Sequence, residues 1–71
     1  MPMAASITLA NPYLADLVYR RIVGEVKAVG KQAEISVEGD VIKIKLEGVE
    51  ELVWRIVKSF PAAVFVSIDF R

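Results

Sequence analysis

The sequence predicts a single α+β domain in which two helices lie on an antiparallel sheet. Two observations carry this prediction. Hydrophobic residues alternate with polar ones in four short stretches, and they recur at helical spacing in two longer stretches between them. The order along the chain is strand, helix, strand, strand, helix, strand. Because the 71 residues contain no linker or low-complexity segment, we expect residues 1–71 to form one domain.

The central feature is a hairpin over residues 33–48. Apolar residues alternate with polar ones on both sides of Gly39-Asp40: Ile35 and Val37 before it, and Ile42, Ile44 and Leu46 after it. Glycine accepts the positive φ of a two-residue turn, and so short a loop fixes the register. The predicted pairs are Glu38–Val41, Val37–Ile42, Ser36–Lys43, Ile35–Ile44 and Glu34–Lys45. One face of the hairpin is therefore expected in the core and the other in water.

The first helix is expected to begin after Asn11 and to end at Gly30. Asn is a favoured N-cap, Pro12 suits the first helical position, and Gly is common just past a helix. Asp16 and Arg20 are spaced as an i, i+4 ion pair. The predicted core stripe is Leu14, Val18, Ile22 and Val26, widened by Leu17 and Val29.

The second helix is expected over Val49–Phe60, because Pro61 terminates it. Acidic residues in its first turn and basic residues in its last turn suit the helix dipole. Its predicted buried face is Val49, Leu52, Val53, Ile56, Val57 and Phe60. By helical angle Trp54 lies off this face, among Glu50, Glu51 and Lys58.

The first and last strands of the sequence complete the pattern. Residues 6–10 place Ile7 and Leu9 inward. Residues 63–70 place Val64, Val66, Ile68 and Phe70 on one side, and Phe65, Ser67 and Asp69 on the other. Two strand-helix-strand halves around a hairpin indicate the ferredoxin-like βαββαβ sandwich, with both helices on one face of the antiparallel sheet.

The composition offers little to catalysis. The chain has no His, no Cys and no Gly-rich phosphate loop, so a Ser-His-Asp site and a thiolate metal site are excluded. The pair Glu50-Glu51 belongs to the first turn of a helix. We expect no enzyme activity, no cofactor and no metal. With no secretory signal and no membrane-spanning stretch, we expect a cytoplasmic protein without membrane contact.

The surface is expected to associate with other proteins. Hydrophobic residues make up 55% of the chain, against about 45–50% in ordinary domains, and self-association would hide the excess. We therefore expect a homodimer formed through the helices, an edge strand or both. The predicted partner interface is Tyr19, Val23, Trp54 and Arg55. Partial cover of Trp54 by neighbouring long side chains is the alternative.

Nucleic-acid contact is a further hypothesis, for Arg20, Lys43 and Lys45. The two lysines point outward on a central strand, where ferredoxin-like RNA-binding domains place aromatic residues for base stacking. No aromatic residue occupies such a position here, so the contact expected of the lysines is with phosphate groups and not with bases. The alternative is a solvated strand face and a solvated helix. A formal net charge of zero gives no overall basic field.

Four stretches resemble the small Pcc-type subunit of the archaeal and eukaryotic KEOPS complex. They are Ala-Ser-Ile-Thr-Leu at 5–9, Leu-Ala-Asp-Leu-Val-Tyr at 14–19, the hairpin at 35–46, and Glu-Leu-Val-Trp-Arg-Ile-Val-Lys-Ser-Phe at 51–60. Lys58 stands where the family has Asn, and the chain departs from the family at Pro61 and the strand-like segment after it.

The resemblance implies a non-catalytic subunit. Such subunits homodimerise, dock through their helices on an ATP-dependent catalytic subunit, and help to hold tRNA during threonylcarbamoylation of adenosine. From a different class, the alternative is a ferredoxin-like regulatory domain that binds a small molecule at a homodimer interface. An enzyme of unknown type is the third hypothesis.

Overall fold

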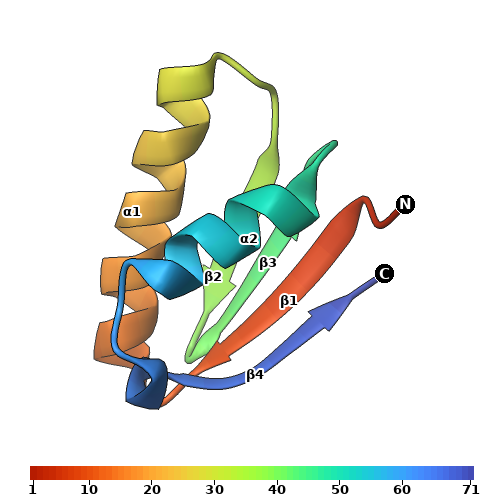
Figure 1. Cartoon of the computed structure of the whole chain (residues 1–71). Coiled ribbons are helices and arrows are strands. Elements are labelled where there is room, and N and C mark those ends of the chain that lie inside the picture. Colours follow the sequence, from red (N-terminus) through yellow and green to blue (C-terminus); the bar gives the residue numbers. More distant parts are fainter.

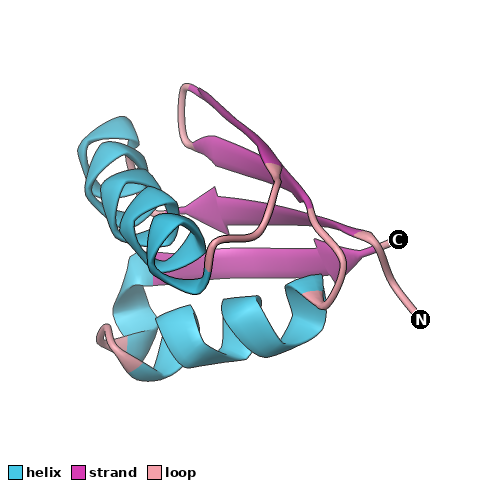
Figure 2. Cartoon of the chain, turned by 90° about the horizontal axis from the view of Figure 1, so that it is seen from above, coloured by secondary structure: helices cyan, strands magenta, loops and turns pink.

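The computed structural model describes all 71 residues, and its element order is the predicted one (Figure 1). The sheet is antiparallel with strand order β2-β3-β1-β4, and both helices lie on one of its faces (Figure 2). This is the ferredoxin-like α+β fold, as predicted. The elements are β1 (Ala4–Leu9), α1 (Pro12–Val29), β2 (Glu34–Glu38), β3 (Val41–Lys45), α2 (Val49–Lys58), the 3₁₀ turn η1 (Ala62–Val64) and β4 (Phe65–Phe70).

The hairpin of β2 and β3 has the predicted register in all five pairs, and Gly39 adopts the positive φ of 61° that its turn requires. Ile42 and Ile44 of β3 are buried in the core. Val37 was expected there too and is 37% exposed, so that expectation was wrong. The reason is position, because β2 is an edge strand and has a neighbour on one side only.

The first helix begins and ends where the sequence predicts. The Asn11 side chain accepts a hydrogen bond from the Leu14 N–H at 2.8 Å, and Gly30 caps the other end at φ 69°. The core stripe differs from the expectation at its margins. Leu14 is only partly buried, Leu17 and Val29 are 44% and 51% exposed, and the buried members are Ala15, Val18, Ile22 and Val26. A helix lying on a sheet buries a narrow stripe, so the outer apolar residues stay at the surface.

The second helix follows Gly48, which has a φ of 79°, and ends two residues before the predicted end at Phe60. Phe60 is still partly buried against the core from its place after the helix. Four of the six predicted core residues are buried: Val49, Leu52, Val53 and Ile56. Val57, like Phe60, packs on the margin of the core.

The last strand starts later than expected, and one residue in it is out of phase. Leu9 pairs with Phe65 but Thr8 pairs with Ser67, so Val66 is an extra residue in a β-bulge. Phe65 consequently packs on the core and Val66 is 66% exposed, the reverse of the predicted sides. Beyond the bulge, Ile68 and Phe70 pack on the core as expected.

The core is small for so apolar a chain. It contains 15 buried residues of 71, all hydrophobic, and no buried polar residue. Since 55% of the chain is hydrophobic, most of its hydrophobic side chains keep some exposure to solvent. The fold alone therefore leaves apolar surface at several places, and these places delimit the candidate sites.

Candidate interaction surfaces

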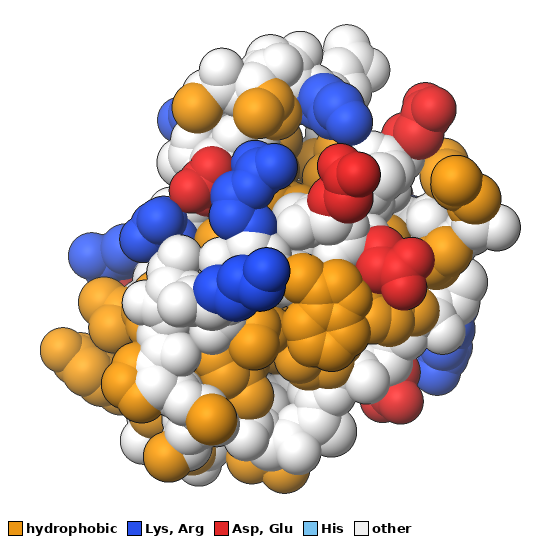
Figure 3. Space-filling view, viewed as in Figure 1, with side chains coloured by type: hydrophobic (Ala, Val, Ile, Leu, Met, Phe, Trp, Pro, Cys, Tyr) orange, Lys and Arg blue, Asp and Glu red, His pale blue; other side chains and the backbone are white.

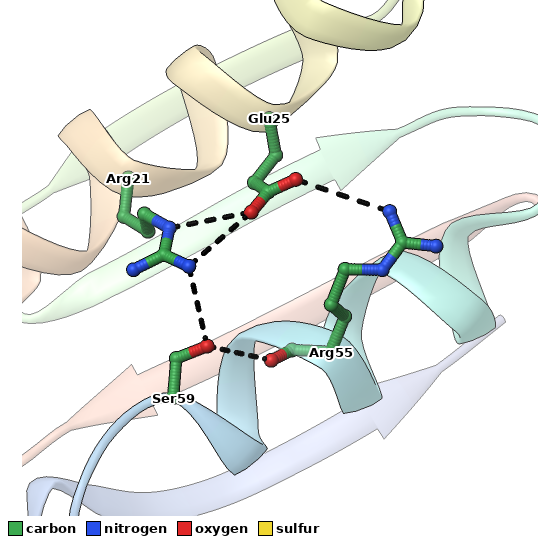
Figure 4. Close-up of polar contacts among 4 residues, drawn as sticks. All are labelled: Arg21, Glu25, Arg55 and Ser59. Carbon is green, nitrogen blue, oxygen red and sulfur yellow. Dashed lines mark hydrogen bonds and ion pairs between the residues drawn. The ribbon is translucent and has the colours of Figure 1, made fainter.

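A polar seam joins the two helices through one carboxylate. Glu25 on α1 accepts hydrogen bonds from Nε and Nη2 of Arg21, both at 3.3 Å, and lies 3.9 Å from Nη1 of Arg55 on α2 (Figure 4). Arg21 also donates to Ser59 Oγ at 3.4 Å, and Ser59 Oγ donates to the Arg55 carbonyl at 3.0 Å. The predicted interface residue Arg55 is thus engaged between the helices of its own chain.

The seam carries excess positive charge, because two guanidinium groups share one carboxylate. The Glu25 side chain is 22% exposed, whereas those of Arg21 and Arg55 are about half exposed. Figure 3 shows Lys and Arg side chains over the two helices, with Asp and Glu side chains among them. Sequence reasoning missed Glu25. The i, i+4 spacing of Arg21 and Glu25 was the available signal, but their link to α2 was not visible in it.

Trp54 lies at the edge of the sheet formed by β4. Its ring centroid is 5.9 Å from that of Phe70, with a tilt of 51°, and the residue is 46% exposed. The ring is therefore half covered by an aromatic residue of β4, in addition to its neighbours on α2. The other half faces solvent in the strip between α2 and β4, where Figure 3 shows hydrophobic side chains at the surface.

Tyr19 and Val23 lie near the opposite edge. They are partly buried and line a groove of about 490 Å³ between α1 and β2, together with Ile35. Because β2 and β4 are the two ends of the sheet, the four predicted interface residues do not form one surface. Tyr19 and Val23 lie beside β2, Trp54 lies beside β4, and Arg55 lies in the seam between the helices.

The open face of the sheet carries the two predicted lysines. Lys43 lies opposite Ser6, and Lys45 lies opposite Ala4. Both lysines are exposed, and neither is within ion-pair distance of an acidic group, although Glu34 is the strand partner of Lys45. With Arg71 they line a hollow of about 230 Å³ over the small side chains of β1.

Arg71 is a residue that the sequence prediction did not include. Its backbone pairs with Ala4, which brings it beside β1 and into the same hollow as the lysines. Arg20 lies elsewhere, on the helix layer, and forms an ion pair with Asp16 at 3.1 Å as its spacing predicted. The three predicted nucleic-acid contacts are thus divided between the two faces of the molecule.

The acidic side chains are not grouped in threes as metal ligands would be. Neither helix combines the length and the apolar character that a membrane span needs. Comparisons with known protein families, with curated proteins and with solved structures found no match. The structure is a small ferredoxin-like α+β domain with two open sheet edges, a polar seam between its helices and a cationic hollow on its open face.

Proposed function

We propose that the chain is a non-catalytic, homodimeric subunit of a KEOPS-like complex that modifies tRNA, and that it scaffolds the catalytic subunit. The observation that carries the proposal is the resemblance together with its placement in the fold. The four stretches fall in β1, the first part of α1, the β2–β3 hairpin and α2 with the two residues after it, in that order. The rest of α1 and all of η1 and β4 lie outside them.

The helix layer is the surface offered to the catalytic subunit. Tyr13 and Leu17, one turn apart on α1, are 76% and 44% exposed. Exposed apolar residues beside basic ones are typical of protein interfaces, in which aromatic residues and Arg are enriched. Arg21 and Arg55, whose side chains are about half exposed, are among the basic residues on this layer.

The open face of the sheet is the surface offered to tRNA. Lys43, Lys45 and Arg71 place three cations around one hollow, and phosphate groups are recognised chiefly by such cations. The chain as a whole has no net charge. Binding to RNA in this proposal is therefore local and shared with the other subunits, and the isolated chain should bind RNA weakly at physiological salt.

Affinity capture of the tagged chain from cell extract tests the proposal. Recovery of a kinase-like and an ATPase-like protein would support it, and the double variant Lys43→Glu, Lys45→Glu, altered on the opposite face, should recover both equally well. A dimer without these partners whose melting temperature shifts with amino acids or nucleotides would contradict it. That result would support the small-molecule regulatory domain instead, and the groove between α1 and β2 would be the first place to seek its ligand.

A further inference from the structure

The outer edge of β4 has unpaired backbone groups that can be assigned to residues. Ala4 and Arg71 exchange N–H···O bonds in both directions, at 3.1 and 2.8 Å. In an antiparallel ladder such bonded pairs alternate with non-bonded pairs. Ser6–Asp69 is thus the next bonded pair, so the N–H and C=O groups of Ile68 and Phe70 point away from β1 to the free edge.

Exposed hydrophobic side chains lie beside these unpaired groups. Trp54 packs on Phe70 from the helix layer and is 46% exposed, and Val66 at the bulge is 66% exposed. Ile68 and Phe70 themselves are only partly buried. A strand added at this edge would pair the free backbone groups and would also cover the exposed parts of these hydrophobic side chains.

The other edge of the sheet is less suited to adding a strand. β2 carries a glutamate at each end of its five residues, and both are exposed. A symmetric pairing centred on Ser36 would place Glu34 opposite Glu38 of the second copy, and like charges directly opposite are destabilising. β4 carries a single charged residue, Asp69, in six. Charge is a usual protection of edge strands, and β4 has less of it.

We infer that two copies of this chain pair antiparallel through their β4 edges, with the two-fold axis at Ile68. This inference rests on the dimeric state within the proposed function. A pairing centred on Asp69 would set two carboxylates face to face. Centring on Ile68 instead sets Asp69 opposite Ser67 of the second copy, whose hydroxyl can donate to the carboxylate.

The same register also pairs apolar residues on the core side of the strand. Ile68, which packs on the core, meets Ile68 of the second copy in a bonded pair. Trp54, which lies over Phe70, then covers the join from the helix layer. A second copy is the occupant because one strand supplies both halves of each match, which is the condition for a closed two-fold interface.

Disulfide trapping tests the register, since the chain has no cysteine of its own. The single variants Ser67→Cys and Asp69→Cys alter exposed positions on the open face. Directly opposite residues in a non-bonded pair have Cα atoms about 4.5 Å apart, within disulfide range. When the two variants are unfolded together, refolded and oxidised, the mixture should form a linked dimer at least several-fold faster than either variant alone.

Three results would overturn the inference: faster linking of Asp69→Cys alone, faster linking of Ser67→Cys alone, or a wild-type monomer in sedimentation at micromolar concentration. The test is separate from that of the proposed function. A trapped dimer that captures no kinase-like or ATPase-like partner overturns the function and leaves this pairing standing. A chain that captures those partners but links faster as a single variant overturns only the pairing, whereas a wild-type monomer also removes the dimer from the proposed function.

Discussion

The start of α1 depends on one side chain. Asn11 has extended backbone angles, and its Oδ1 accepts the Leu14 N–H at 2.8 Å, which satisfies a donor that the first turn leaves free. We expect Asn11→Ala to lower the free energy of unfolding by about 1 kcal/mol. Asn11→Asp, which keeps the acceptor, should stay close to wild type. Urea unfolding followed by circular dichroism measures both, and an equal loss in the two variants would contradict the capping role.

Local chemistry explains which residues could be predicted from the sequence. The roles of Asn11, Gly30 and Gly39 depend on their own backbone angles and on neighbours within four residues, so the sequence revealed them. The contact of Trp54 with Phe70 joins residues 16 positions apart. Helical angle showed that Trp54 lies off the core face of α2, but not that a strand edge lies beneath it.

Two glycines, one within α1 and one directly after it, have opposite roles. A Cβ added at Gly24 would meet nothing within 4 Å, and its φ is that of an ordinary helix residue, whereas Gly30 is left-handed at φ 69°. Gly24→Ala should therefore raise the free energy of unfolding by about 0.5–1 kcal/mol, because alanine has the higher helix propensity. Gly30→Ala should lower it by about 1 kcal/mol through strain. Denaturant midpoints at equal slope measure both, and a stabilising Gly30→Ala would refute this account of the cap.

Among the strands, the sequence predicted the hairpin fully and β4 only in part. The β2–β3 register follows from a two-residue turn, which is a local constraint. The bulge at Val66 depends on how β4 meets β1, more than 50 residues earlier in the chain. Alternation of polar and apolar residues has no signal for one extra residue, so it assigned Phe65 and Val66 to the wrong sides.

The open face of β3 carries the prediction for RNA. Lys43→Glu with Lys45→Glu should leave the fold intact, because both side chains are exposed and unpaired with acidic groups. In the assembled complex, the double variant should weaken tRNA binding and reduce the slope of log affinity against log salt by roughly 2, about 1 for each lost phosphate contact. An unchanged slope would remove both β3 lysines as phosphate contacts.

At the scale of the whole molecule, the predicted interface was divided by the fold. Tyr19 and Val23 lie beside β2, Trp54 beside β4, and Arg55 between the helices. Helical periodicity places a residue relative to its own helix. It does not show which edge of the sheet that side of the helix overlies, so residues that lie near opposite edges were grouped in one interface.

The oligomeric state follows from the apolar surface that the core leaves over. If two copies bury the strip along β4, the melting temperature of the wild type should rise with protein concentration. Trp54→Ala should then weaken the dimer by on the order of 2 kcal/mol, roughly a 30-fold rise in Kd, while circular dichroism shows the same secondary structure. Tyr13→Ala, which removes a more exposed aromatic side chain on α1, is the matched control and should leave the Kd unchanged. Sedimentation over a concentration series measures these constants.

If Trp54 serves only to cover Phe70 within one chain, its removal should lower the melting temperature by the same amount at every concentration and leave the Kd unaltered.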